Sequence, residues 1–383
     1  MPEPFSLYVH VPYCRHVCPY CDFNVHAAAR PPEEHYTAGL VAELTACGAQ
    51  EPWGGRRVKT VYLGGGTPSL FSPASIGGIV TAVTRWFGLV DGAEITLEAN
   101  PGTLSHASLA GYRRAGVNRL SLGAQSFHPR HLQTLGRDHG PDDVRAAVDA
   151  AGAVGFENLS LDLIFGVPGE TLADWEADLA QAVTLAPAHV STYALTYESG
   201  TPFHAWRARG RLRPVDEDLE AEMGELATAR LGSAGYERYE ISSYARSGFA
   251  ARHNLSYWDG SDYLGLGAGA HSFSQEPAPG VRSTNERLPE RYLAAVGTTG
   301  TAVASVERLT EATARAEFCF TGLRQTVGID VASFHRRFGT ELAAAFPHVS
   351  DLIGDGLLDL AAGRLRLTPR GLAFADTVSA TFV

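Results

Sequence analysis

The chain has 383 residues, of which 45% are hydrophobic and 19% are charged, as in a globular protein with one large domain and a smaller one. Its formal net charge is −11 and Lys59 is its only lysine, so it is a poor electrostatic partner for nucleic acid or anionic lipid. We see no export signal at the N-terminus and no apolar run near the ~20 residues of a membrane-spanning helix, so we expect a cytoplasmic protein, with peripheral membrane contact left open.

Short runs rich in Val, Ile, Leu or Tyr alternate with longer segments whose apolar residues lie three and four apart. The predicted strands are residues 7–11, 60–63, 94–98, 119–123, 159–164 and 190–195. The predicted helices are residues 33–47, 72–87, 105–115, 142–153 and 172–185. This alternation indicates parallel strands with right-handed crossovers. Six such units are fewer than the eight of a closed barrel, so we predict an α/β fold with an open, partial (β/α)6 barrel; an open doubly wound sheet fits nearly as well.

The second half of the chain changes character. Residues 207–239 read as a linker, a charged helix over 216–231 and a short strand, and residues 249–272 are aromatic and glycine-rich. Helices over 311–323, 330–338 and 369–378 surround a hairpin over 356–367, which predicts a small winged-helix-like α+β domain. We therefore predict three parts: a core barrel over 1–240, a connecting segment over 241–300 and a C-terminal domain over 301–383. DNA binding by the tail is disfavoured because it lacks a dense basic face.

Three cysteines near the N-terminus carry the strongest chemical signal. Cys14, Cys18 and Cys21 form a C-x3-C-x2-C run, and Phe23 stands where a fourth ligand could have followed. A cubane iron–sulfur cluster needs a ligand on each of its irons, so three thiolates leave one iron open. This arrangement predicts a cluster whose free iron binds S-adenosylmethionine (SAM), the starting point of radical chemistry.

Two other uses of clustered cysteines were weighed. A zinc site would need a fourth ligand such as His16 or His10, because Cys47 and Cys319 are isolated in apolar helical segments. A disulfide framework is disfavoured because five cysteines are few for this length and odd in number, which suits a reducing compartment.

Further polar residues follow the predicted strands at their carboxyl ends, where the working residues of α/β barrels lie. The run 64–67 follows the second strand, and its glycines let backbone carbonyls approach an ammonium group, although a plain turn would look the same. Glu98 could hold an ammonium or ribose hydroxyls, and Gln125 hydrogen-bonds in both directions. Arg137 could clamp a carboxylate. Asp162 lies in an apolar strand and needs a partner such as Arg137 or a ribose, a structural ion pair being the alternative.

A second dense group of residues lies in RHNLSYWDG, from Arg252 to Gly260. His253 could ligate iron, and Tyr257 and Trp258 offer flat apolar surfaces to a planar macrocycle. A lone histidine that is merely hydrogen-bonded or exposed is the more common case.

Taken together, these motifs resemble a known family. The cysteine run with GGGTP, LEANP, RLSLGAQSF, LGRDH and SLDLIFGVPGET resembles the radical SAM family of oxygen-independent coproporphyrinogen III oxidases over nearly the whole chain, and most of all its HemW-type heme chaperones. The resemblance implies a [4Fe-4S] cluster, SAM and heme as cofactors, and Tyr8, Gly65 and Glu98 as contacts of the SAM on the cluster. The positions that match the second SAM site of the family's oxidases are Tyr20, Gly66, Thr67, Gln125, Arg137, Asp162 and Ala194.

Two departures from the oxidases favour the chaperone branch. The oxidases have a further cysteine where this chain has Phe23, and a longer extension precedes their cluster loop. The run from His253 to Trp258 matches the chaperone branch's H-N-x-x-Y-W motif, which implies that His253 ligates heme while Tyr257 and Trp258 pack on it.

The leading hypothesis is therefore a heme chaperone that passes heme to an acceptor such as a respiratory hemoprotein, without coproporphyrinogen dehydrogenase activity. The rival hypothesis is an oxygen-independent coproporphyrinogen III dehydrogenase of porphyrin biosynthesis. A radical SAM enzyme acting on nucleic acid through the tail is disfavoured by the net charge. A homodimer is left open.

Overall fold

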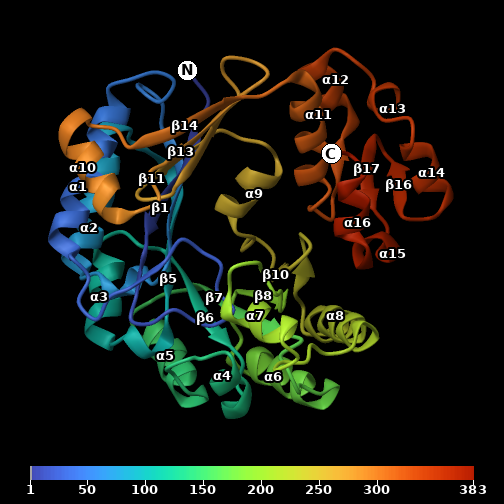
Figure 1. The fold of residues 1–383 in the computed structure, drawn as a ribbon, viewed down its shortest axis with the longest axis horizontal. Coiled ribbons are helices and arrows are strands. Elements are labelled where there is room, and N and C mark those ends of the chain that lie inside the picture. Colours follow the sequence, from blue (N-terminus) through green and yellow to red (C-terminus); the bar gives the residue numbers. More distant parts are fainter. Residues whose placement is uncertain (1) are drawn as a thin grey trace.

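A curved sheet of 12 strands dominates the computed structural model, which describes residues 2–383 (Figure 1). Six parallel strands lie side by side in chain order, and a seventh parallel strand, from later in the chain, pairs with the first of them. The six are β1 (Phe5–Val11), β4 (Val58–Gly65), β5 (Leu89–Ala99), β6 (Arg119–Gln125), β7 (Asn158–Phe165) and β8 (His189–Ala194). The order never reverses, as it would in a doubly wound sheet. The predicted partial (β/α)6 barrel is therefore confirmed.

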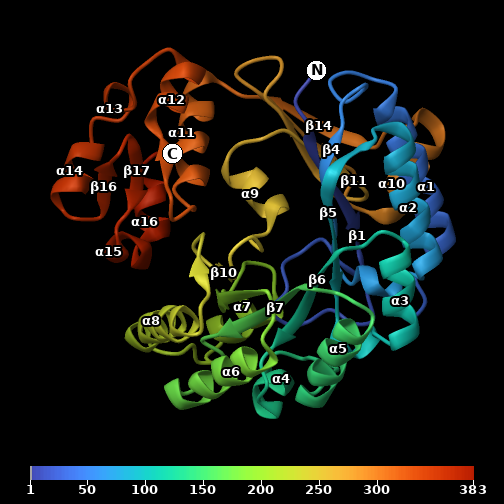
Figure 2. The ribbon, with the colours of Figure 1, turned by 180° about the vertical axis from the view of Figure 1, so that it is seen from behind.

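Helices connect the parallel strands and cover the convex side of the sheet (Figures 1 and 2). The long ones are α1 (Glu33–Gly48), α2 (Pro73–Trp86), α3 (His106–Arg114), α5 (Pro141–Ala153), α6 (Leu172–Leu185) and α8 (Glu217–Ser233), and the short ones are η1 (Pro68–Leu70), η2 (Pro101–Thr103), α4 (Pro129–Thr134) and α7 (Pro202–Ala208). The predicted start of α2 is confirmed, since the Ser72 side chain accepts a hydrogen bond from the Ser75 amide and Pro73 occupies the first turn.

Alternation along each parallel strand separates an apolar shell from a polar interior. In β4, Val61 and Leu63 belong to the main apolar core, while Tyr62 points the opposite way and hydrogen-bonds to Glu98. In β7, Leu161 lies in the same core. Because successive strand residues face opposite sides, the concave side of the sheet receives the polar set. This pattern positions the candidate site.

The open barrel has two edges, and further strands extend both of them. Beyond β8 lie β10 (Ser243–Ala245) and β9 (Glu237–Arg238), and beyond β1 lie β11 (Tyr263–Leu266), β12 (His271–Ser274), β13 (Val281–Asn285) and β14 (Val303–Arg308). The sequence analysis did not predict β11–β14, which are short. Pairing them covers edges that would otherwise present unpaired backbone groups. The division at residues 240 and 300 stays a prediction.

The remaining elements lie beyond the barrel strands. Helix α9 (Arg252–Trp258) lies on the concave side, and α10 (Pro289–Thr299) lies beside α1 (Figures 1 and 2). The C-terminal unit has its own apolar core and a three-stranded sheet. Its elements are α11 (Glu311–Gly322), β15 (Ile329–Asp330), α12 (Val331–Phe338), α13 (Leu342–Ala345), α14 (Val349–Gly354), β16 (Leu358–Ala361), β17 (Arg364–Leu367), α15 (Pro369–Ala373) and α16 (Ala375–Ala380).

The predicted hairpin in the C-terminal unit is formed by β16 and β17. Ala362 and Gly363 turn the chain with φ angles of 50° and 74°, the two left-handed residues of a tight hairpin turn. Across residues 2–383, no helix combines the length and apolar character that crossing a membrane requires.

A buried carboxylate fastens the added strands to the barrel. Glu43 of α1 is 3% exposed and accepts hydrogen bonds from the Gly267 amide at 2.9 Å, Asn285 Nδ2 at 2.6 Å and the Tyr292 hydroxyl at 2.7 Å. Burial raises the pKa of Glu43 to about 7. One side chain thus joins α1 to the loop after β11, to β13 and to α10.

Replacing this carboxylate tests its role in stability. We expect Glu43→Gln to lower the free energy of unfolding by about 1–3 kcal/mol, because all three neighbours are donors and the Gln amide group must face one of them. Urea denaturation at about pH 8, above that pKa, measures the loss. Glu34→Gln, at an exposed position of the same helix, is the matched control and should change little. Equal stabilities of the two variants would contradict the assignment.

Candidate functional site

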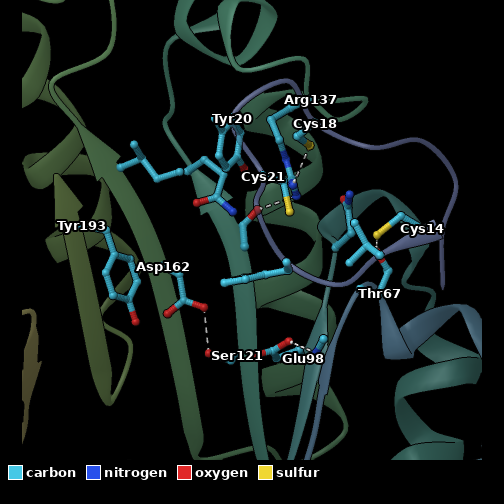
Figure 3. Close-up of a pocket in the computed structure, with 18 of the residues that line it drawn as sticks. Cys14, Cys18, Tyr20, Cys21, Thr67, Glu98, Ser121, Arg137, Asp162 and Tyr193 are labelled. Atoms are coloured by element: carbon cyan, nitrogen blue, oxygen red, sulfur yellow. Dashed lines mark hydrogen bonds between the residues drawn. The ribbon is translucent and has the colours of Figure 1, made fainter. Parts of the chain in front are cut away.

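A cavity of about 520 Å³ lies at the carboxyl ends of the parallel strands. Figure 3 shows the three cysteines toward one end of it, with Glu98, Ser121 and Asp162 deeper on the strands. The predicted residues that line it are Cys14, Cys18, Tyr20, Cys21, Gly65, Gly66, Thr67, Glu98, Gln125, Arg137, Asp162 and Ala194. The fold thus gathers residues from a loop and from several strands, while their individual roles stay predictions.

The cysteine loop between β1 and α1 places three sulfurs against the cavity and includes β2 (Tyr13–Cys14) and β3 (His26–Ala27). Thr67 Oγ1 donates to Cys14 Sγ at 3.5 Å, and Arg137 Nη1 donates to Cys18 Sγ at 3.6 Å. Burial raises the pKa of the Cys14 thiol and raises that of Cys21 to about 11, and the neighbouring cysteines add to both shifts. Three thiolates here need a cation, so the donor set fits a metal centre.

The spacing of the sulfurs separates a cluster from a single zinc ion. Two thiolates on one zinc lie about 3.8 Å apart, given Zn–S bonds of about 2.3 Å in a tetrahedron. The three cysteines are not among the groups in residues 2–383 whose ligand atoms all lie within 4.8 Å of one another. His10 and His16, the proposed fourth zinc ligands, instead bond to the Asn24 and Gly136 carbonyls. In a cubane each cysteine takes a separate iron, which suits the wider spacing.

The glycine run at the end of β4 packs directly against the cysteine loop. Gly65 has φ of 115°, and a Cβ there would lie 2.5 Å from the His10 ring. A Cβ on Gly66 would lie 2.6 Å from the Tyr13 carbonyl oxygen. The Gly66 amide donates to the Val11 carbonyl at 2.8 Å. The glycines are therefore needed for the loop to lie against the strand, in addition to any approach of a ligand.

Glu98 is a partly buried carboxylate that faces the cavity. It accepts hydrogen bonds from the Tyr62 hydroxyl at 2.7 Å and from the Gly65 amide at 3.0 Å. Burial nevertheless raises its pKa to about 7, well above the ordinary value of 4.5. A bound ammonium group would offset this desolvation and favour the charged form.

Asp162 does not pair with Arg137. The sequence analysis had expected either Arg137 or a ribose as its partner. Its carboxylate accepts hydrogen bonds from Ser121 Oγ at 2.8 Å and from Ser160 Oγ at 3.1 Å, and burial raises its pKa. Arg137 instead donates to the Gly123 carbonyl at 3.1 Å, and its charge faces the sulfur of Cys18. The two hydroxyls and the nearby charge of Arg119 lower the pKa of Asp162, although burial outweighs them.

Gln125 reaches the cavity from an irregular end of β6. The pairing of β6 with β7 shifts register between Gly123 and Gln125, and Gln125 has φ of 65°. A left-handed backbone is unfavourable in a residue other than glycine, and Gln125 adopts it outside a helix end or a hairpin turn, where Ala186 and Ala362 adopt it. This bulge turns the Gln125 side chain toward the cavity lined by Arg137.

Four predicted residues do not line the cavity. The Tyr8 hydroxyl lies 2.9 Å from His10 Nδ1, and the Tyr8 ring stacks on Tyr62. His253 is 1% exposed; its Nδ1 lies 2.8 Å from Thr60 Oγ1 and its Nε2 lies 2.8 Å from the Tyr257 hydroxyl. In this conformation both imidazole nitrogens therefore have hydrogen-bond partners.

Tyr257 and Trp258, the other two predicted residues outside the cavity, pack against the barrel and the C-terminal unit respectively. The centroid of the Tyr257 ring lies 4.7 Å from that of Tyr263 in β11, and the two rings meet edge-on. The guanidinium of Arg324 lies over the Trp258 ring at 4.5 Å, so Trp258 links α9 to the C-terminal unit.

Further residues that the sequence analysis did not single out also line the cavity, among them Arg119, Ser121, Tyr193 and Asn254. Arg119 is 2% exposed, and its Nε has no hydrogen-bond partner in the described chain. Its charge lowers the pKa of both Glu98 and Asp162, although burial of these carboxyls outweighs it. The signal was present, because positions 119, 121 and 123 of β6 share one face of the strand.

The raised pKa of Glu98 predicts pH-dependent SAM binding. The carboxyl becomes charged as pH rises through about 7, so affinity for the SAM ammonium should increase between about pH 5.5 and 7.5. We expect Glu98→Gln to abolish this dependence and to weaken binding about tenfold or more, as for a lost charged hydrogen bond. Anaerobic calorimetry on cluster-loaded protein measures both, with the exposed Glu237→Gln as control. A pH-independent affinity in the unmodified chain would contradict the assignment.

Comparison with family models and curated proteins places these features in context. Residues 8–182 match the model of the radical SAM superfamily, and residues 309–374 match that of the HemN C-terminal domain. The heme chaperone HemW of Bacillus subtilis is 35% identical, with 99% of each chain covered. HemW of Escherichia coli is 37% identical over 99% of this chain and 98% of its own. The mouse mitochondrial radical S-adenosyl methionine domain-containing protein 1 is 34% identical over 99% of this chain and 87% of its own.

A solved structure supports the fold independently of sequence. The coproporphyrinogen III oxidase HemN of Escherichia coli superposes with a TM-score of 0.85, covering 99% of this chain and 90% of its own, at 22% identity. Barrel and C-terminal unit are thus arranged as in that enzyme.

Proposed function

Because this chain belongs to the HemW family of radical SAM proteins, we propose that it is a heme chaperone, which binds heme and transfers it to an acceptor hemoprotein. The observation that carries this proposal is the end-to-end likeness to HemW chaperones, at 35% and 37% identity over 99% of the chain. Phe23 adds to it, because this position holds a cysteine in the oxidases that the chain resembles and here is 66% exposed beside the cavity.

The cysteine cavity holds the [4Fe-4S] cluster and SAM. We assign the cluster to Cys14, Cys18 and Cys21, and the SAM on its open iron to Gly65 and Glu98. Bound there, the pair supplies one-electron chemistry at SAM. Tyr8, the third SAM residue that the resemblance implies, does not line the cavity and would act through its contact with Tyr62, which does. The chain itself contributes donors to the sulfurs, from Thr67 Oγ1 and Arg137 Nη1, and a carboxylate for the SAM ammonium. The positions that we assign to a second SAM are Tyr20, Gly66, Thr67, Gln125, Arg137, Asp162 and Ala194.

Heme ligation by His253 requires a movement of α9. Burial lowers the pKa of His253 to about 3, so the imidazole is neutral, the form that ligates iron. Its two nitrogens are nevertheless bonded to Thr60 and Tyr257, and its backbone amide donates to Glu94 Oε1 at 3.0 Å. We therefore propose that heme loading displaces α9 and exchanges the Tyr257 hydrogen bond for an iron bond, with Tyr257 and Trp258 packing on the macrocycle.

Two substitutions distinguish the proposed heme ligand, His253, from its hydrogen-bond partner, Tyr257. We expect His253→Phe to abolish the histidine-type heme spectrum and to weaken heme affinity at least about tenfold, by analogy with the loss of other metal-site contacts. Tyr257→Phe should retain the spectrum and bind heme faster, because it frees Nε2 of His253. His271→Ala, at an exposed histidine, is the control. Anaerobic heme titration by absorption gives both readouts, and unchanged spectra in His253→Phe would remove this residue as the ligand.

An assay of heme transfer, together with an assay of enzyme activity, distinguishes a heme chaperone from a coproporphyrinogen III dehydrogenase. Heme-loaded protein mixed with an apo-hemoprotein should lose its heme to the acceptor, as followed by absorption. Under a strong reductant with SAM and coproporphyrinogen III, we expect no sustained formation of protoporphyrinogen. Sustained turnover would instead favour the coproporphyrinogen III dehydrogenase and overturn the chaperone proposal.

We further propose a respiratory hemoprotein as the acceptor, reached by peripheral contact with the membrane from the cytoplasm, and a homodimer as the working form. The edge strand β14 supports the homodimer, because all six of its residues are exposed and Val306 is 61% exposed. Such an edge is a template for pairing with a second copy. Light scattering should show dimers of the unmodified chain and monomers of Val306→Lys. If both were monomers, the homodimer proposal would be wrong.

A further inference from the structure

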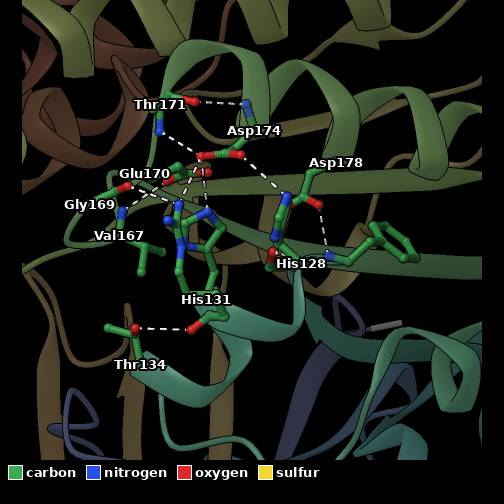
Figure 4. Close-up of polar contacts among 12 residues, drawn as sticks. His128, His131, Thr134, Val167, Gly169, Glu170, Thr171, Asp174 and Asp178 are labelled. Atoms are coloured by element: carbon green, nitrogen blue, oxygen red, sulfur yellow. Dashed lines mark hydrogen bonds and ion pairs between the residues drawn. The ribbon is translucent and has the colours of Figure 1, made fainter.

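A second group of metal-ligating side chains lies outside the cysteine cavity, where α4 meets α6. His128 immediately precedes α4, His131 lies in the first turn of α4, and Asp174 lies in the first turn of α6. One ligand atom from each residue forms a set whose members all lie within 4.8 Å of one another. Figure 4 shows both imidazole rings directed at the Asp174 carboxylate.

His131 is the least satisfied member of the group. Its side chain is 0% exposed, and its Nδ1 has no hydrogen-bond partner in the described chain. Leaving a buried polar group unpaired costs about 1–3 kcal/mol. Burial also lowers the pKa of His131, so the ring is neutral and a lone pair is available to a cation. Its Nε2 lies 3.5 Å from Asp174 Oδ2, which aims that nitrogen at the carboxylate.

The distances in the group suit a small tetrahedral ion. His128 Nε2 lies 3.3 Å from Asp174 Oδ1, and His131 Nε2 lies 3.5 Å from Asp174 Oδ2, so each imidazole faces a different oxygen of the carboxylate. Ligands on one zinc ion lie about 3.3 Å apart, given zinc–nitrogen and zinc–oxygen bonds of about 2.0–2.2 Å in a tetrahedron. One ligand atom from each residue lies within 4.8 Å of the others, so a small inward shift of the side chains would bring the set to the spacing that zinc requires.

Negative charge beside the group also favours a cation. Two further acidic side chains, Glu170 and Asp178, lie beside Asp174 and are 3% and 1% exposed. Burial raises the pKa of Glu170 to about 8 and that of Asp178 to about 6, so Glu170 is uncharged at neutral pH and the negative charge comes from Asp174 and Asp178. The guanidinium group of Arg130 forms an ion pair with this group, because its Nη2 lies 3.2 Å from Asp174 Oδ2. Its side chain is 60% exposed, so the pair is weak and readily opened by a competing cation.

We propose that His128, His131 and Asp174 form a binding site for a divalent transition-metal ion of the zinc class. Two imidazoles and one carboxylate are donors that zinc prefers, and a water molecule can fill the fourth position. The ion joins α4 to α6 across the convex side of the barrel. Since α4 lies between Gln125 and Arg137 in the chain, the bound ion would steady the segment that carries both cavity residues.

Metal analysis of the cluster-loaded full chain tests the site, with Zn²⁺ and Co²⁺ as probes. We expect one Zn²⁺ per chain beyond the iron, and visible Co²⁺ absorption in its place. His128→Ala should weaken Zn²⁺ binding at least about tenfold. The His128 side chain is 41% exposed and makes no helix-capping bond, so this variant should fold. Arg130→Gln should tighten binding several-fold, because it removes the competing guanidinium. The exposed His106→Ala is the control.

Two outcomes would overturn the site. One is equal Zn²⁺ affinity in His128→Ala, Arg130→Gln and the unmodified chain. The other is zinc that persists in His128→Ala but disappears when Cys14, Cys18 and Cys21 are all changed to Ser, which would assign it to the cysteine loop. A rise in melting temperature with Zn²⁺ that is lost in His128→Ala gives an independent readout that does not depend on heme or SAM.

Discussion

The burial of charged groups inside an incompletely closed barrel governs the rest of this structure. The concave side of the sheet carries the buried Glu94 and Arg119 and the partly buried Glu98 and Asp162, and removing such groups from water is expensive unless donors replace the solvent. Glu98 receives the Tyr62 hydroxyl and a glycine amide, and Asp162 receives two serines. Each carboxylate is thereby held in place, but burial keeps the pKa of both raised. The cavity is thus prepared to bind a positively charged ligand group.

The need to satisfy buried charges also explains the position of α9, which follows β8 in the chain. Glu94 accepts hydrogen bonds from the backbone amides of Arg252 and His253, which seats the N-terminal end of α9 on the concave side of the sheet. Ser6 and Ser256 add a further hydrogen bond between β1 and α9 at 2.8 Å. His253 therefore contributes to the stability of the barrel as long as α9 stays there. A role as heme ligand would use a residue whose resting contacts must first be broken, which couples loading to a change of conformation.

Two kinds of metal chemistry are separated by geometry in this chain. Cysteine sulfurs spread around the mouth of the cavity suit a cluster, in which each thiolate binds its own iron. Two imidazoles and a carboxylate whose ligand atoms lie within 4.8 Å of one another suit a single ion. The first site needs a loop held by glycines of β4, and the second needs two helices brought together by the packing of neighbouring βα units.

The sequence by itself determined the barrel strands and helices, because their periodicities are local, and it determined the cysteine trio, because three ligands within one short loop are neighbours in any fold. The carboxyl-end rule also predicted that Glu98, Gln125 and Asp162 would share a cavity with the cysteines. Only the tertiary structure decided the strands β11–β14: in β13 and β14 buried and exposed residues do not alternate, and all four strands extend an edge that the barrel leaves open. It also decided that Arg119 lies in the cavity, that His253 is buried and paired, and that His128 and His131 meet Asp174. Such contacts join residues far apart in the chain, and no local pattern encodes the distance between them.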